Sequence, residues 1–426
     1  MVQDRHIPRR GRVAVIGSGV SGLTAAHILR ERAEVTLLEA DDRLGGHAHT
    51  HRITDEHGAE LLVDSGFIVH NRRTYPNLIR LFDELGVDTR PTEMSLSVAC
   101  DGCGLEYAGS RGPRALLPTG PRATVAHVRM LTEIPRFHRA ARALLDAPDA
   151  DPGPTLGEFV AQSALSPYTV AHFVVPLVSA VWSCPPGTAL DYPARYLFAF
   201  LANHGMLGIW GSPRWRTVVG GSRSYVERVA KNLDVVRTGT PVRSVERVPD
   251  GVRLRLDGRE EDFDAAVIAV HADQALALLP RPTPAEREVL GAFRYSRNRT
   301  LLHTDASVLP RDPAARASWN HRLPSCDPDA GPVRVSYDMN RLQHLPGRRR
   351  HLVTLNDDGR VRPDDVLAEM DYEHPVYTPA ALAAQRRIAD LDDGVIAFAG
   401  AHHGWGFHED GCASGVRAAE SLGVTW

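Results

Sequence analysis

The chain has 426 residues, of which 43% are hydrophobic and 24% are charged, and its formal net charge is −3. This length exceeds one ordinary hydrophobic core, so we expect two domains or one elaborate domain. The near-neutral charge excludes the strongly basic surface of a nucleic-acid-binding protein. Residues 1–11 are polar and basic and lack the apolar run of a signal peptide, so we expect a cytoplasmic protein without a nucleic-acid partner.

The first predicted elements surround a glycine-rich loop. Residues 13–16 read as a buried strand, residues 17–22 follow as Gly-Ser-Gly-Val-Ser-Gly, and a helical pattern comes next. In such a loop Gly17 permits the tight turn, Gly19 lets a pyrophosphate approach the backbone, and Gly22 lets the helix pack on the strand. These could be simple turn glycines, but the strand before them and the helix after them favour dinucleotide binding.

The second predicted strand, residues 35–39, ends in a carboxylate. Glu39 lies seventeen residues after Gly22, close to the spacing of about 20 residues expected of a ribose-binding acid. The segment from Ala40 onward starts acidic and then supplies Arg43 and the pair Gly45-Gly46. A loop of this composition can pass close over a bound cofactor.

Three histidines in the same loop invite a metal interpretation. His47, His49 and His51 alternate along the sequence, so in an extended segment they face one side, and imidazoles are common ligands of zinc, copper and iron. No acid or cysteine completes the set nearby. We therefore favour contact with the cofactor over metal binding for this triplet.

A CxxC motif, Cys100 to Cys103, follows in a segment that predicts a hairpin over residues 92–107. The central Asp101-Gly102 pair is also a common hairpin turn. Because the sequence contains no second CxxC, we predict a turn here and no metal site anywhere in the chain.

The remaining pattern alternates between mixed and helical blocks. It predicts helices over residues 75–85, 125–145, 156–165, 168–182, 193–204, 225–233, 272–279, 380–391 and 412–422, a linker over 146–154, and strands over 61–69, 216–219, 242–248, 252–256, 263–270, 300–304, 333–339, 352–355 and 395–400. We predict a discontinuous cofactor domain from residues 1–90, 215–280 and 385–426, and a substrate domain from residues 91–214 and 281–384.

Several motifs together carry a family resemblance. They are the loop at 17–22, Glu39 with Arg43-x-Gly45-Gly46, the pair Gly220-Gly221, the strand containing Val242, and a C-terminal strand-glycine-helix that ends in Gly411-x-x-Ser414-Gly415. The chain thereby resembles the flavin-containing amine oxidase and phytoene desaturase superfamily. Phrases such as RLGGHAHT, VDSGFIVHNRRTYPN and DYEHPVY are similar to bacterial FAD-binding proteins often encoded beside cyclopropane-fatty-acyl synthases.

The resemblance implies an α/β fold in which a Rossmann-like FAD-binding domain of the glutathione-reductase type carries an inserted helical and β substrate domain. It implies FAD as the cofactor, with Val242 meeting the adenine and the start of the last helix facing the flavin, where a helix N-terminus stabilises negative charge. The implied cofactor-binding residues are Gly17, Gly19, Gly22, Glu39, Ala40, Arg43, Gly45, Gly46, Val242, Gly400, Gly411 and Cys412.

Two departures from the family pattern are informative. Many amine oxidases place a lysine, through water, beside the flavin N5, whereas Lys231 is the only lysine here and follows Gly220-Gly221 in a cofactor-type segment. Amine oxidation is therefore disfavoured. Relatives with a FAGTE-like motif carry an acid for the ribityl chain where this chain has Ala401-His402, so the resemblance does not supply that contact.

The candidate catalytic residues lie in the segment after the last predicted strand. Glu409 and His408 are candidates for proton transfer, and His403 stands beside aromatic residues that could form a wall of the substrate site. The alternative for Glu409 is a helix cap, because acids favour the first turn of a helix.

We therefore predict an FAD-dependent oxidoreductase that takes hydride from an aliphatic, fatty-acyl or lipid-like substrate, with peripheral membrane contact as a further expectation. Such chemistry needs positioning and a dry, apolar site more than it needs charged groups. The alternatives are a flavin amine oxidase, a redox-neutral FAD-dependent isomerase, and a non-catalytic FAD-binding partner of a lipid methyltransferase.

Overall fold

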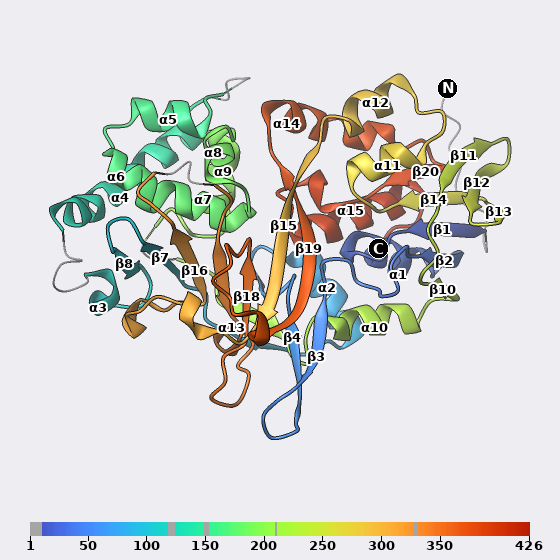
Figure 1. The fold of residues 1–426 in the computed structure, drawn as a ribbon. Helices are drawn as coiled ribbons and strands as arrows, with labels where there is room; N and C mark the ends of the chain where they lie inside the picture. Colours follow the sequence, from blue (N-terminus) through green and yellow to red (C-terminus); the bar gives the residue numbers. More distant parts are fainter. Residues whose placement is uncertain (1–10, 118–123, 149–152, 209–210, 328–330) are drawn as a thin grey trace.

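A five-stranded parallel sheet forms the centre of one half of the molecule (Figure 1). The computed structural model describes residues 11–117, 124–148, 153–208, 211–327 and 331–426. In sheet order the strands are β10 (Val235–Arg237), β2 (Glu34–Leu38), β1 (Arg12–Ile16), β14 (Ala265–Ile268) and β20 (Ile396–Phe398). Residues 13–16 of β1 are all buried, as expected of a parallel strand that is covered on both faces.

Helices from distant parts of the chain surround this sheet: α1 (Val20–Leu29), α2 (Pro76–Leu85), α10 (Arg223–Lys231), α11 (Ala272–Leu278), α12 (Pro284–Leu290) and α15 (His408–Ser421). The first and last of them pack closely, because a Cβ on Gly415 would lie 2.4 Å from the backbone oxygen of Ser21. Glycine at this position therefore lets α1 and α15, which are far apart in the sequence, lie side by side (Figure 1).

The start of α15 corrects the sequence prediction. We expected the helix to begin at Cys412, but it begins at His408. The carboxylate of Asp410 accepts a hydrogen bond of 2.9 Å from the backbone N–H of Phe407, which caps a first turn that the sequence pattern assigned to a loop. Gly411 lies inside the helix, where its small size serves packing.

A small antiparallel sheet contains the strands predicted over 242–248 and 252–256 and a third strand that the sequence pattern did not predict. It contains β11 (Ser244–Val248), β12 (Gly251–Leu256) and β13 (Arg259–Phe263), and it leads directly into β14. Val242 precedes β11 and is not part of it, so the predicted strand starts two residues too early. The segment between β10 and β11 is held at the end of the parallel sheet, where the backbone N–H of Gly239 donates to the Asp41 carbonyl at 2.7 Å.

The other half of the molecule contains a seven-stranded sheet. Its strands, in sheet order, are β19 (Val366–Val376), β15 (Arg294–His303), β18 (Leu352–Leu355), β17 (Val335–Asp338), β16 (Trp319–Leu323), β7 (Leu96–Cys100) and β8 (Glu106–Ala108). The hairpin predicted over residues 92–107 is confirmed as β7 and β8. The longest strand, β19, was not predicted, because charged residues and Pro375 interrupt its apolar alternation.

A helical layer covers one side of this sheet: α3 (Pro113–Leu116), α4 (Val125–Asp146), α5 (Leu156–Gln162), α6 (Pro167–Thr169), a π-helix (Val170–Val174), α7 (Val175–Trp182), α8 (Pro186–Leu190) and α9 (Ala194–Asn203). The predicted helix over 168–182 is therefore interrupted by a π-helical turn. Of the predicted linker over 146–154, residues 149–152 lie outside the described residues, as do residues 1–10 of the basic N-terminal segment.

Shorter elements complete the fold. They are the hairpin β3 (Thr50–Thr54) and β4 (Glu60–Asp64), the small sheet β5 (His70–Asn71), β9 (Trp215–Val218) and β6 (Thr89–Pro91), the helices α13 (Met339–Leu342) and α14 (Pro379–Gln385), and short 3₁₀ turns at Ala306–Val308, Pro313–Ala315, Pro363–Asp365, Ile388–Leu391 and Ala401–His403. The helix predicted over 380–391 thus ends early and continues as a separate turn.

The strands separate by sequence segment. The parallel sheet draws on residues 12–38, 235–268 and 396–398, and the seven-stranded sheet draws on residues 96–108 and 294–376. The domain boundaries themselves stay a prediction. Across the described ranges, no helix combines the length and apolar character that crossing a bilayer requires.

Candidate functional site

The glycine loop between β1 and α1 is shaped by the protein's own packing at two of its three glycines. Gly17 has a φ of +98°, and a Cβ on Gly22 would lie 2.0 Å from the backbone oxygen of Gly17. Neither position tolerates a side chain. A Cβ on Gly19, by contrast, would meet no heavy atom within 4 Å. Gly19 therefore faces open space at the start of α1.

The start of α1 fits an anionic ligand. Its N-cap, Gly19, offers no side-chain hydrogen bond, and its first turn contains no acidic residue. Val20, Ser21 and Gly22 are nevertheless buried. The first backbone N–H groups of any helix lack partners within the helix, and a buried helix end without a cap is well suited to a pyrophosphate. The residues present therefore fit a dinucleotide such as FAD.

Glu39 lies at the end of β2 and is tied to the glycine loop. Its carboxylate accepts hydrogen bonds from the backbone N–H of Ser18 at 2.8 Å and from the Ser18 hydroxyl at 2.5 Å. The backbone N–H of Thr240 donates to the Glu39 carbonyl at 2.8 Å, which brings the half-buried Val242 toward the same edge. Ala40 is exposed just beyond. This edge can therefore hold the ribose and adenine end of the cofactor.

The loop that follows Glu39 crosses the glycine loop. The backbone N–H of Gly45 donates to the Ser18 hydroxyl at 3.0 Å, and a Cβ on Gly46 would lie 3.1 Å from the Cα of Gly19. Arg43 donates from Nη1 to the Gly46 carbonyl at 2.8 Å. The paired glycines and Arg43 thus stand over the position that a pyrophosphate would occupy.

The C-terminal cofactor candidates reach the same place from β20 and α15. The backbone N–H of Gly400 donates to the Ser414 hydroxyl at 2.9 Å, and a Cβ on Gly411 would lie 2.6 Å from Cγ1 of Val20. Cys412 is fully buried, and its sulfur accepts a hydrogen bond from the Thr24 hydroxyl at 3.3 Å. Gly411 therefore lies beside the start of α1, whereas the Cys412 thiol points to the helix packing.

A chain of hydrogen bonds orders the imidazoles next to this loop. The Asn356 amide donates to Oδ1 of Asn298 at 2.7 Å, and the Asn298 amide donates to Nδ1 of His374 at 3.0 Å. The proton of neutral His374 is thereby placed on Nε2, which lies 3.2 Å from Nε2 of His47. His47 is consequently the acceptor, and its own proton is placed on Nδ1.

Burial keeps the imidazoles of this region uncharged. It lowers the pKa of His374 to about 4 and the pKa values of His49 and His408 to about 3, and it holds the pKa of His47 well below its usual range. Burying a cationic imidazole away from water is costly, so the neutral form is favoured. At neutral pH these side chains supply hydrogen bonds but no positive charge.

The three candidate catalytic residues do not converge on one point. His408 stacks on Phe67 with ring centroids 3.7 Å apart, and its Nε2 lies 3.2 Å from the Tyr225 hydroxyl. His403 accepts a hydrogen bond from Arg417 at 3.1 Å. Glu409 accepts three hydrogen bonds from the start of α2. It therefore caps α2 and not its own helix, α15. A catalytic role for each stays a prediction.

The contacts of Glu409 give a prediction. Its carboxylate accepts from the backbone N–H and side-chain amide of Asn77, at 3.1 and 2.7 Å, and from the backbone N–H of Leu78 at 3.0 Å. Glu409→Ala is expected to lower the free energy of unfolding by about 2 kcal/mol, because these bonds join a carboxylate to a helix N-terminus. Urea unfolding measures the change, with the exposed Glu420 of the same helix replaced by Ala as the control. Equal stability of both variants would contradict a capping role.

An aromatic wall lies on the other side of the loop before α15. Phe407 stacks on Phe200 with centroids 4.6 Å apart, Trp182 donates from Nε1 to the Trp405 carbonyl at 3.2 Å, and the Tyr196 hydroxyl donates to the Gly404 carbonyl at 2.7 Å. The helical layer therefore holds this loop through rings and hydrogen bonds. Lys231, the only lysine, is exposed at the end of α10.

The three histidines of the triplet have separate hydrogen-bond partners. His47 pairs with His374, His49 lies 3.0 Å from the Tyr372 hydroxyl, and His51 lies 2.8 Å from the Ser65 hydroxyl. Among the described residues, the one group with ligand atoms close enough to hold a metal is elsewhere. The preference for a cofactor-contact loop over a metal is consistent with these separate partners.

Two site residues, Tyr372 and His374, were missed from the sequence. They alternate on β19 and so point to the same face of the sheet, and this two-residue spacing within DYEHPVY was the available signal. Asp64 is a buried hydrogen-bond acceptor beside these residues. It accepts from Thr50 at 2.5 Å, from Ser222 at 2.7 Å and from Gln343 at 2.8 Å.

Comparison with known proteins agrees with this architecture. A family model described as flavin containing amine oxidoreductase matches residues 20–305. A protein of Mycobacterium tuberculosis named as a flavin-containing monoamine oxidase, AofH, is 25% identical over 349 residues, which are 79% of this chain and 72% of that protein. A carotenoid phi-ring synthase of Streptomyces griseus is 29% identical over 307 residues, 68% of this chain and 57% of that protein.

Solved structures share the whole fold at low sequence identity. Putrescine oxidase bound to putrescine has a TM-score of 0.67 at 18% identity and covers 96% of this chain and 98% of its own. A CLA-producing fatty acid isomerase from P. acnes has a TM-score of 0.66 at 15% identity, with the same coverage. The mixed α/β fold and the arrangement of residues around the glycine loop agree with these matches. The chain belongs to the flavin-containing amine oxidoreductase family and is an FAD-dependent oxidoreductase.

Proposed function

We propose that this oxidoreductase takes a hydride from an uncharged aliphatic substrate of the fatty-acyl or lipid-like class. When bound, FAD supplies a two-electron acceptor for that hydride. The observation that carries the proposal is the electrostatic character of the site: its imidazoles are held neutral by burial, and the neighbouring wall is aromatic. Such surroundings suit a carbon chain and exclude water.

Residues on the two sides of the site have different roles. Arg43 and the amides at the start of α1 would hold the cofactor's pyrophosphate. The pair His47 and His374 supplies fixed, uncharged hydrogen-bonding groups, and Trp405 and Phe407 supply apolar surface. The only lysine, Lys231, is exposed at the end of α10, so we do not assign it the place beside the flavin that a lysine has in many amine oxidases.

Two similar proteins support a lipid-like substrate by their names. One is the carotenoid phi-ring synthase, and the other is the CLA-producing fatty acid isomerase. Exposed apolar side chains at the start of the helical layer, Leu117, Val125 and Val128, are 51%, 87% and 52% accessible. They support a peripheral contact with a membrane, from which a lipid could enter.

Anaerobic mixing tests the proposal. The flavin absorbance of the purified holoprotein is expected to bleach with at least one member of a panel of free fatty acids, acyl esters and phospholipids. A matched panel of primary and secondary amines serves as the control. Bleaching by an amine with none by any lipid would overturn the proposal and favour the amine oxidase alternative, which peroxide release on amine addition would support.

A redox-neutral isomerase is the second candidate, because the similar fatty acid isomerase shares the fold. Substrate deuterated only at the position that leaves as hydride separates the two activities: a desaturase product loses that deuterium to the flavin, and an isomerase product retains it because the flavin returns it. A third alternative, a non-catalytic partner of a lipid methyltransferase, would leave the flavin oxidised with every substrate and would co-purify with that enzyme.

A further inference from the structure

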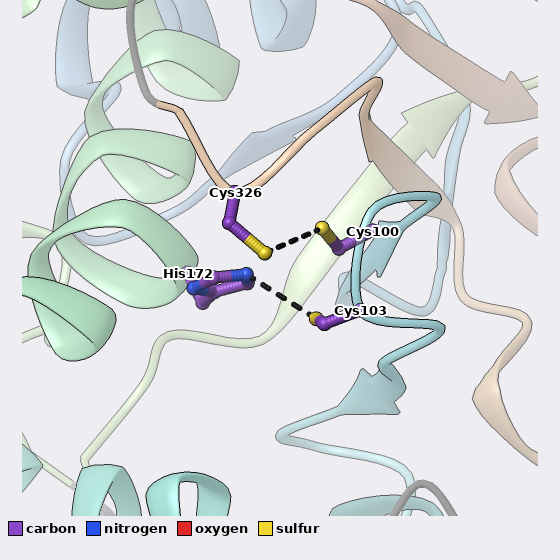
Figure 2. Close-up of side chains that lie close together, drawn as sticks. All are labelled: Cys100, Cys103, His172 and Cys326. Atoms are coloured by element: carbon purple, nitrogen blue, oxygen red, sulfur yellow. Dashed lines mark hydrogen bonds between the residues drawn. The ribbon is translucent and has the colours of Figure 1, made fainter.

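Four potential metal ligands from three distant segments meet at the edge of the seven-stranded sheet (Figure 2). Cys100 and Cys103 come from the turn between β7 and β8, His172 from the π-helical turn, and Cys326 from the loop after β16. One ligand atom from each residue lies within 4.8 Å of all the others. The pairs are 226 and 69 residues apart in sequence, so the fold, not the local motif, assembles the group.

Two separations within the group match a tetrahedral zinc site. The sulfurs of Cys100 and Cys326 lie 3.8 Å apart, and the Cys103 sulfur lies 3.6 Å from Nε2 of His172. With zinc–sulfur bonds of about 2.3 Å and zinc–nitrogen bonds of about 2.05 Å, a tetrahedron has edges of about 3.8 Å between sulfurs and about 3.6 Å between sulfur and nitrogen. A disulfide would need about 2.0 Å between the sulfurs, so these thiols are not bonded to each other.

The imidazole of His172 is oriented as a ligand. Its Nδ1 lies 3.0 Å from the carbonyl oxygen of Tyr168 and so carries the proton, which leaves the lone pair of Nε2 aimed at the thiols. The Tyr168 ring stacks on the imidazole with centroids 4.0 Å apart. A ligand histidine characteristically donates its other N–H to a carbonyl or carboxylate in this way. The π-helical turn that carries His172 is a local irregularity of the kind found at functional sites.

The cysteine-bearing loops are also fixed in place. The backbone N–H of Asp101 donates to the Leu323 carbonyl at 2.9 Å, and the N–H of Gly104 donates to the Cys100 carbonyl at 2.9 Å. Arg322 and Arg360 both bind the Asp101 carboxylate, at 2.7 and 2.8 Å. The turn is thereby held against the end of β16, which leads into the loop that carries Cys326.

We propose that Cys100, Cys103, His172 and Cys326 form a Cys₃His site for a structural Zn²⁺ ion. The donor set is typical of closed structural zinc sites, in which four protein ligands leave no position for a substrate. The ion would join the turn of the sheet hairpin, the helical layer and the loop after β16. The sequence pattern predicts no metal site because the chain has no second CxxC motif. The other two ligands, His172 and Cys326, lie far from the CxxC along the chain.

Metal analysis of the purified holoprotein tests the site. We expect close to one zinc per chain in the wild type and in the control Cys184→Ala, which removes a buried cysteine outside the group. Cys326→Ser is expected to lower zinc content by about tenfold or more after dialysis against a chelator. Because Cys326 is exposed, this variant is expected to keep its fold and its flavin, which the visible spectrum checks.

A second measurement does not depend on any variant. Protein prepared with Co²⁺ in place of zinc is expected to show the absorption bands of a tetrahedral cobalt thiolate at wavelengths beyond the flavin bands. Wild-type protein that binds neither ion, equal zinc content in the wild type and Cys326→Ser, or a Cys100–Cys326 disulfide in protein purified without oxidant would each overturn the proposal.

Discussion

Gly19→Ala is expected to lower the affinity for FAD by about tenfold or more while leaving the apoprotein as stable as the wild type. Gly19 has φ −62° and ψ 172°, angles that alanine adopts without strain, and the new Cβ would meet no protein atom within 4 Å. The methyl group would therefore occupy only the space that the pyrophosphate needs. Titration of the deflavinated protein with FAD, followed by flavin fluorescence, measures the change.

Two further glycines make this a controlled comparison. Gly109→Ala also adds a methyl group to open space, but outside the cofactor segment, and is expected to change neither affinity nor stability. Gly22→Ala would place a Cβ 2.0 Å from the Gly17 carbonyl oxygen and is expected to destabilise the apoprotein itself. Unchanged FAD affinity in Gly19→Ala would show that the pyrophosphate does not lie at the start of α1.

The second prediction with a large expected effect is that the folded protein loses stability in acid. Burial lowers the pKa of His321 to about 3 and those of His70 and His303 to about 4, whereas an unfolded histidine titrates at about 6.5. Between those values the unfolded chain binds protons that the folded chain excludes. The stability is therefore complete above about pH 6.5 and falls as the pH drops toward 4, by up to about 1.4 kcal/mol per pH unit for each such group.

Buried carboxyl groups change the dependence of stability on pH in the opposite direction. Burial raises the pKa of Asp64 and of Asp410 to about 6 and that of Asp392 to about 7, so the stability that they contribute is present at low pH and lost as the pH rises through those values. The histidines outnumber them, since eight have a pKa lowered to about 3 or 4: His49, His70, His204, His303, His321, His374, His402 and His408. We therefore expect a net loss of stability below about pH 6.5.

Scanning calorimetry between about pH 7.5 and pH 5 measures this loss. The variant His321→Leu is expected to flatten the dependence of stability on pH, because neither ring nitrogen of His321 has a hydrogen-bond partner and the substitution removes only a buried titrating group. His57→Leu, at an exposed position, is the control and should follow the wild type. An identical pH dependence in His321→Leu would contradict the assignment.

The part of the site that would hold FAD could be predicted from sequence because the residue patterns that indicate it are local. Gly17, Gly19 and Gly22 span the passage from β1 into the first turn of α1, and the structure places Glu39 and the Arg43 loop against it. Backbone geometry of this kind is encoded by residue type and short spacing. The same is true of the turn between Cys100 and Cys103, which forms as expected.

The part of the site around His374 and Glu409 could not be predicted in the same way. His374 reaches His47 across 327 residues of sequence, and Glu409 caps a helix 332 residues earlier, so neither partner is visible in a local pattern. The sequence pattern places the start of α15 too late, because Gly406 before the helix and Gly411 inside its first turns are typical of a loop, whereas Asp410 caps the helix at Phe407. Tertiary contacts of high sequence separation decide these features.

The lipid-like substrate class is tested most directly by a matched pair of reductants with the same aliphatic chain, a fatty-acyl ester and the corresponding primary amine. Each is mixed anaerobically with the holoprotein, and the rate of flavin bleaching is recorded. A site with neutral imidazoles and an aromatic wall is expected to be reduced by the ester and not by the amine. Reduction by the amine alone would contradict the proposed substrate class.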